Sequence, residues 1–137
     1  MRAVIRSILT ILIVASTAGA QGTPTKPLPP ERRICDMSMR IVSLQLRTAA
    51  GAPVSGASIT VRRVRTRTLV DRAEAMGDQG DYKVIEDGTL ADLRAGGEPF
   101  DVTFRKGARV RRVRLLIGMD AGGCHVALKS GPTRVSM

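Results

Sequence analysis

The sequence is poor in aromatic residues and in the side chains on which most enzyme and metal sites depend. Its 137 residues include no tryptophan, one tyrosine, two phenylalanines and one histidine. A single histidine excludes metal sites built on paired histidines within one chain, and His125 alone does not meet the needs of a hydrolase that uses several. The scarcity of aromatic rings also argues against the base-stacking platform of proteins that bind single-stranded nucleic acid. We therefore do not expect nucleic acid as a partner.

Sequence motifs of catalysis are missing as well. The chain contains no G-x-S-x-G elbow, no H-E-x-x-H pair, no P-loop and no G-x-G-x-x-G turn. A catalytic site needs a placed nucleophile, base or metal. We therefore expect a protein that is not an enzyme and that carries no cofactor.

The first 20 residues are arranged like a secretory signal peptide. Arg2 and Arg6 precede an apolar run over residues 8–15, and the small residues A-G-A follow at 18–20. The run is shorter than the roughly 20 residues that span a membrane. We therefore predict a cleaved signal peptide over residues 1–20, with an uncleaved anchor as the alternative. The mature chain would then have no transmembrane segment and would be secreted or periplasmic.

The remaining chain divides into a linker and one domain. Residues 21–34 are rich in proline and predict an extended linker, and residues 35–137 predict the folded domain. An exported chain with two cysteines favours a disulfide, here between Cys35 and Cys124. Such a bond would close a loop of about 90 residues and stabilise the domain by about 4 kcal/mol.

Alternating apolar and polar residues predict β-strands along the domain. Val42, Leu44 and Leu46 share one face of an extended segment. A similar run follows over residues 57–61, and the glycine- and proline-containing segment between them predicts either a β-hairpin or a corner between two sheets. Further alternation over residues 100–104 and 113–117 supports an all-β fold. We predict a single antiparallel β-sandwich of about seven strands, prealbumin-like or immunoglobulin-like.

Two stretches carry more detailed expectations. Residues 69–76 are expected to form a loop with a short helix. In the last strand, alternation over residues 124–128 places Cys124 on the buried face and His125 on the exposed face.

A family resemblance accompanies these patterns. The segment G-x-P-V-x-G-A-x-I-x-V over residues 51–61 resembles the opening of carboxypeptidase regulatory-like domains, which have a prealbumin-like sandwich related in shape to transthyretin. The turn over residues 78–82, with its acidic residues, glycine and tyrosine, is similar to the next element of that family, and the strand over residues 100–107 is similar to the third. Ala108 replaces the aromatic residue usual after the last glycine. The resemblance implies an accessory, non-catalytic module with no shared active site.

The strongest indication of binding is a repeated arginine motif. The sequence V-R-R-V-R occurs at residues 61–65 and again at 110–114. If the two strands are neighbours, their six arginines, together with Arg67, Arg105 and Arg109, form a cationic sheet face able to hold sulfate, phosphate or carboxylate groups through bidentate contacts. The alternative is that the charges guard exposed strand edges against aggregation. The candidate anion-binding residues are Arg62, Arg63, Arg65, Arg111, Arg112 and Arg114.

The net charge agrees with an anionic partner. The whole chain carries +10, with 22 basic and 12 acidic residues, and a positive field favours anionic partners. We expect an anionic glycan or lipid head group, or a protein partner bound at a sheet edge. The alternative chemistry is a periplasmic copper site, in which thioether and imidazole groups bind Cu(I). Its ligands would be Met37, Met39, Met119 and His125.

Overall fold

Eight strands and one 3₁₀ helix make up residues 35–137, the part of the chain that the computed structural model describes. The predicted signal peptide and linker, residues 1–34, lie outside the described residues. Among residues 35–137 no helix is long and apolar enough to cross a membrane. In chain order the elements are β1 (Ile41–Arg47), β2 (Ser58–Arg63), β3 (Glu74–Ala75), β4 (Asp81–Glu86), η1 (Asp87–Asp92), β5 (Glu98–Lys106), β6 (Arg109–Met119), β7 (Val126–Ser130) and β8 (Arg134–Ser136).

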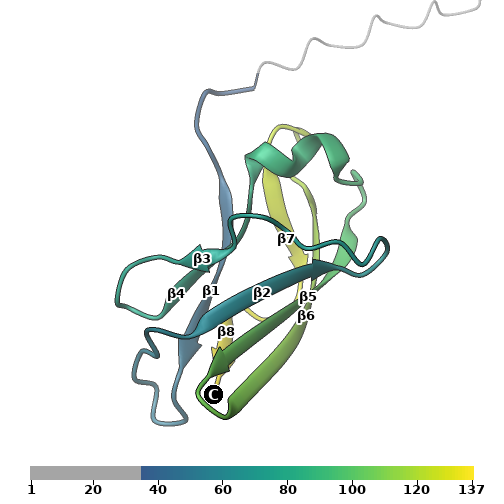
Figure 1. The fold of residues 1–137 in the computed structure, drawn as a ribbon. Helices are drawn as coiled ribbons and strands as arrows, with labels where there is room; N and C mark the ends of the chain where they lie inside the picture. The colour runs from purple at the N-terminus through teal and green to yellow at the C-terminus, as the bar shows by residue number, and fades with distance from the viewer. Residues whose placement is uncertain (1–34) are drawn as a thin grey trace, which may run out of the picture. The chain divides into compact units, whose positions relative to one another are not determined.

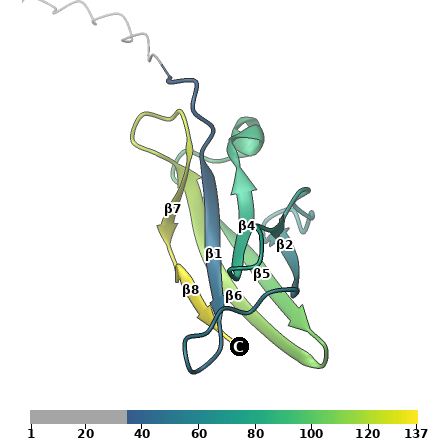
Figure 2. The same cartoon turned by 90° about the vertical axis from the view of Figure 1, so that its left-hand side faces the viewer.

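The strands form two sheets of four, which pack face to face (Figures 1 and 2). One sheet has the order β3-β4-β1-β8 and the other has the order β2-β5-β6-β7. The prediction of an all-β sandwich is confirmed. The strand pairs are antiparallel, as expected, except that β8 lies parallel to β1. The chain crosses between sheets at residues 131–133 without reversing direction, so β8 continues along the same side of the sandwich as β7 (Figure 2).

The apolar faces expected from the sequence form the core between the sheets. Tyr82, Phe100 and Phe104 are all fully buried, so the few aromatic side chains of this protein lie in its interior. Tyr82 and Phe104 meet edge to face, with ring centroids 5.2 Å apart. Most of the aliphatic residues that the alternation predicted for the core are also buried, namely Val42, Leu44, Leu46, Ala57, Val61, Val102, Leu115 and Ile117. Ile59 and Val113 are half-buried and pack against this core.

The connection from β1 to β2 is a corner between sheets and not a hairpin. β1 pairs with β4, whereas β2 pairs with β5 in the other sheet. The hydroxyl of Tyr82 fastens this corner, because it donates to the carbonyl of Val54 at 2.9 Å and accepts from the amide of Ala57 at 3.0 Å. Gly80 lies beneath the same corner at φ +69°, where an added Cβ would come within 2.6 Å of the Leu46 carbonyl oxygen. Only glycine fits this position without displacing the backbone.

The short helix expected within residues 69–76 is not present. Leu69 instead forms a bridge with Arg62 on the edge of β2, and β3 pairs with the edge of β4. The amide of Val70 donates to the Val61 carbonyl at 2.9 Å. The edges of β2 and β4 supply hydrogen-bond partners that a one-turn helix would leave unused. Pairing with these edges therefore overrides the weak helical preference of residues 69–76.

Candidate functional site

The two arginine motifs lie in the same sheet but on strands that are not neighbours. β5 separates β2 from β6, so Arg62 and Arg114 both pair across the ladder with Asp101. The condition that the two arginine strands be neighbours is therefore not met. The intervening strand supplies the acid Asp101 and a further cation, Arg105, to the same face.

The alternation of side chains along each strand places the six predicted arginines on different faces of the sheet. Consecutive residues of a strand point to opposite faces of the sheet, so a doubled arginine cannot place both side chains on one face. Arg62, Arg112 and Arg114 lie on the outer face of the sheet, together with Arg105. We call these four residues the arginine face. They border an open hollow of about 740 Å³, whose other lining residues are Ser58, Thr60, Asp101, Thr103 and Val113.

Two of the four guanidinium groups in the arginine face are already bound. Arg114 forms a bidentate contact with Asp101, at 2.7 Å and 3.1 Å. This hydrogen bond lowers the pKa of Asp101 and raises the pKa of Arg114. Arg62 donates to the backbone carbonyl of Arg67. The side chains of Arg105 and Arg112 are exposed and make no hydrogen bond or ion pair with residues 35–137, so they are the groups free to receive an anion.

Arg63 and Arg65 do not belong to the arginine face. Both contact Glu98, which is only 2 % exposed. The Nε atom of Arg63 lies 3.1 Å from Oε1 of this carboxylate, and the Nε atom of Arg65 lies 3.2 Å from Oε2. The guanidinium of Arg63 also sits 5.6 Å above the ring of Phe100. These two arginines neutralise a buried charge, so their role is structural.

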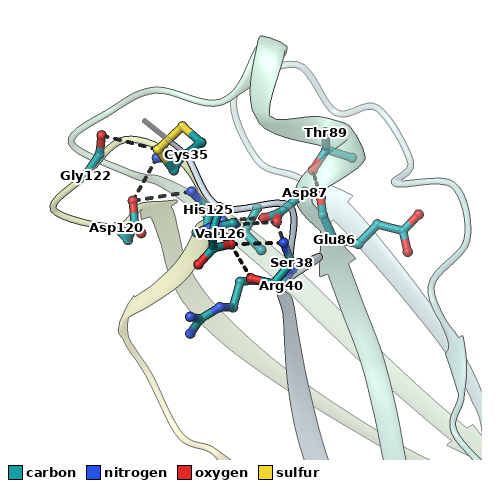
Figure 3. Close-up of polar contacts among 12 residues, drawn as sticks. Cys35, Ser38, Arg40, Glu86, Asp87, Thr89, Asp120, Gly122, His125 and Val126 are labelled. Carbon is teal, nitrogen blue, oxygen red and sulfur yellow. Dashed lines mark hydrogen bonds and ion pairs between the residues drawn. A yellow bond between two sulfur atoms is a disulfide. The ribbon is translucent and has the colours of Figure 1, made fainter. Parts of the chain in front are cut away.

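A second polar cluster lies at the η1 end of the domain and was not predicted. His125 is 7 % exposed and lies between two carboxylates (Figure 3). Its Nδ1 atom is 2.7 Å from Oδ2 of Asp87, and its Nε2 atom is 3.0 Å from Oδ1 of Asp36. Asp87 also accepts hydrogen bonds from the backbone amides of Arg40 and Val126, at 2.8 Å and 2.7 Å. The cluster therefore joins the segment before β1 to η1 and to the start of β7.

The predicted disulfide between Cys35 and Cys124 is present and borders this cluster (Figure 3). The prediction that Cys124 is buried and His125 is exposed is wrong, because His125 is buried while Cys124 is only half-buried. β7 begins at Val126, and the bend before it is fixed by Asp120, whose carboxylate accepts from the amide of Cys124 at 2.9 Å. The alternation of a strand does not extend into this bend.

The charges of the cluster shift the pKa values of its members. The hydrogen bond with Asp87 raises the pKa of His125, and the nearby charges of Asp36 and Asp120 act in the same direction against the effect of burial. Burial alone would raise the pKa of Asp87, but its hydrogen bonds from His125, Arg40 and Val126 outweigh that effect and lower it. The pKa of Asp36 is lowered mainly by its hydrogen bonds from Ser38. The arrangement favours a charged imidazolium between charged carboxylates.

These shifts predict that the protein is most stable in mildly acidic solution. A raised His125 pKa gives stability that is complete below its unfolded value of 6.5 and is lost as the pH rises through the folded value. The lowered carboxyl pKa values give stability that is present above 3.8 and is lost as the pH falls. Chemical denaturation should therefore show stability that decreases as the pH rises above 6.5.

The variant His125→Gln should lose that decrease, because the sequence has no other histidine and its two cysteines are bonded. An equal decline in the variant would show that another group is responsible.

The residues of the copper alternative do not form a ready metal site. Both ring nitrogens of His125 face carboxylates, Met37 and Met39 are exposed before β1, and Met119 is half-buried at the end of β6. Within residues 35–137 no three histidine, cysteine, aspartate or glutamate side chains are grouped so as to hold a metal ion.

Comparisons with known proteins leave the resemblance to carboxypeptidase regulatory-like domains as an expectation. No protein-family model matches the chain, and searches of curated proteins and of solved structures find no match for it.

Proposed function

We propose that this protein is an exported, non-catalytic β-sandwich module that binds anionic groups of the cell envelope through the arginine face. The observation that carries the proposal is the pair of exposed guanidinium groups of Arg105 and Arg112, which have no partner within residues 35–137. They lie beside an open hollow in which Asp101 is the single acid among these described residues. Guanidinium groups bind sulfate, phosphate and carboxylate through paired N–H donors. The hydroxyls of Thr60 and Thr103 add neutral donors between these cations.

The compartment and the accessory role have separate support. The disulfide is consistent with an oxidising, extracytoplasmic location, in agreement with the signal-peptide pattern of residues 1–20. The resemblance to carboxypeptidase regulatory-like domains is consistent with a module that serves another protein or surface and has no active site of its own.

Binding through a sheet edge is less well supported by the structure. The segment that includes the edge strands β7 and β8 carries Lys129, Pro132 and Arg134. Lysine and proline at an edge discourage the addition of another strand. The outer edge of β2 is in turn bridged by Leu69. We therefore assign binding to the outer face of the sheet.

Retention on a dextran sulfate column provides the test. The protein should be retained at low salt and released as the salt concentration rises, because ionic contacts are screened. The variant Arg105→Ser/Arg112→Ser should elute at a markedly lower salt concentration.

The matched control is Arg94→Ser/Arg134→Ser, which removes the same charge from exposed positions outside the arginine face. The control should elute close to the unchanged protein. Equal shifts in the two double variants would show that binding follows net charge alone and would refute the proposal.

A further inference from the structure

The turn between β5 and β6 forms a hairpin that carries cations and no acid. Residues 105–112 read R-K-G-A-R-V-R-R, and no acidic residue occurs between Asp101 and Asp120. All eight residues are exposed. The hairpin lies at the end of the molecule opposite η1 (Figures 1 and 2), so it is well separated from the carboxylates of the histidine cluster.

The cations of this hairpin are distributed over both of its faces. Arg105 and Arg112 point to the outer side, as part of the arginine face. Arg111 pairs with Phe104 and Arg109 pairs with Lys106, and Phe104 belongs to the core-facing side because it is fully buried. Arg109 and Arg111 therefore lie on the same side of the sheet as the core. They are nevertheless exposed, because the hairpin continues beyond the end of the core.

Most of these cations have no side-chain partner among residues 35–137. Lys106 donates to the backbone carbonyl of Ser55 at 2.8 Å. The side chains of Arg109 and Arg111 make no hydrogen bond or ion pair with the described part of the chain, and the same holds for those of Arg105 and Arg112. Four guanidinium groups that have no partner in the described part of the chain lie within eight residues and repel one another. A bound anion relieves that repulsion.

We infer that a flexible polyanion, a chain bearing closely spaced phosphate or sulfate groups, binds the hairpin on both of its faces. This inference rests on the proposed function and names its ligand class. A flat anionic membrane can meet only one face of a two-stranded ribbon, whereas a flexible chain can wrap around it. The hairpin also lacks the aromatic and apolar residues that insert into a membrane interface, since Val110 is its one exposed large apolar side chain.

The experiment compares two double variants of the protein against two polymers and one membrane. The outer pair is Arg105→Ser/Arg112→Ser, the inner pair is Arg109→Ser/Arg111→Ser, and Arg94→Ser/Arg134→Ser is the charge-matched control. The ligands are long-chain inorganic polyphosphate, dextran sulfate, and vesicles of phosphatidylcholine with phosphatidylglycerol. Affinity is measured over a series of salt concentrations, and thermal melting checks that every variant is folded.

The inner pair should bind the polymers about tenfold more weakly than the control does. Its plot of log affinity against log salt should be shallower by about 1.4, since each lost contact removes about 0.7 from the slope for a single-stranded polyanion. Binding to the vesicles should be weak and equal in the inner pair and the control. A difference between the polyphosphate and dextran sulfate affinities identifies the preferred anion, and a tenfold loss with either polymer supports the inference.

Other outcomes would overturn it. If the outer pair loses polymer binding while the inner pair matches the control, the ligand contacts one face only, and the proposed function stands without this inference. If neither pair differs from the control, both fail. If the vesicles bind as tightly as the polymers and the inner pair weakens both, the partner is a membrane.

Discussion

Replacing Cys35 and Cys124 with serine is expected to lower the free energy of unfolding by about 4 kcal/mol. The bond joins residues 89 apart in sequence, with Cα atoms 5.4 Å apart, so the loop that it closes contains six of the eight strands, β1 to β6. Without the bond the unfolded chain gains conformations, whereas the folded state keeps its sheets. The melting temperature should fall by on the order of 15 °C.

The folded state should keep its contacts near the lost bond. Arg40 and Asp87 exchange two hydrogen bonds, at 2.8 Å and 3.1 Å, and these do not involve sulfur. Far-ultraviolet circular dichroism of the double variant should therefore match that of the oxidised protein at low temperature. Guanidinium unfolding then measures the difference in free energy.

Two controls test whether the loss of stability comes from the missing disulfide bond or from the replaced side chains. The unchanged protein unfolded with a thiol reductant present should lose about as much stability as the double serine variant, because both lack the bond. Each single serine variant, also reduced, should agree with them. A loss below about 1 kcal/mol would show that the bond does not restrain the unfolded chain as the loop model requires.

The strands of this protein could be predicted because each has one buried face. In β1 and β5 every second residue is buried over most of the strand, and such regular alternation is typical of a strand with one face against a core. The corner at residues 48–57 remained ambiguous in the sequence, because glycine and proline favour a turn without determining which sheet the next strand joins. Tyr82 and Gly80, distant in sequence, determine it in the structure.

The arginine face could be predicted only in part. The repeated motif identified cationic strands, but it did not show that β5 would lie between them or that Glu98 would engage Arg63 and Arg65. Arg105 lies outside the motif, and the sequence assigned it to the cationic face only on the condition that the two arginine strands were neighbours. Arg105 is five residues after the buried Phe100, and side chains at odd spacings along a strand point to opposite faces. This spacing would have placed Arg105 on the outer face once the register was known.

His125 illustrates why bends are harder to predict than strands. Extending the alternation of β7 back by two residues predicted that this side chain is exposed. In the structure the chain bends before β7, and the Asp120 carboxylate accepts hydrogen bonds from the amides of Cys124 and His125 in this bend. An aspartate shortly before a pair of glycines signals such a turn. The partners of the imidazole, Asp36 and Asp87, come from distant segments, and no local pattern indicates them.

Replacing Glu98 with alanine is expected to destabilise the protein by about 3 kcal/mol, because it leaves the guanidinium of Arg63 buried without its counter-charge. Glu98 is 2 % exposed, and the side chain of Arg63 is 12 % exposed. Arg63 would keep its hydrogen bond to the Asp92 carbonyl at 3.0 Å and its contact with the Phe100 ring. These remaining contacts place the expected loss at the lower end of the range for broken buried pairs.

Two comparisons test whether the buried charge is the cause. Asp101→Ala breaks the exposed ion pair with Arg114, and its effect on urea unfolding should be far smaller, because solvent screens that pair. Glu98→Leu/Arg63→Met removes both buried charges together and should recover most of the stability lost in Glu98→Ala, since an apolar pair has no counter-charge to lose. If the double variant is as unstable as Glu98→Ala, then the loss arises from packing around residue 98 and not from an unpaired guanidinium.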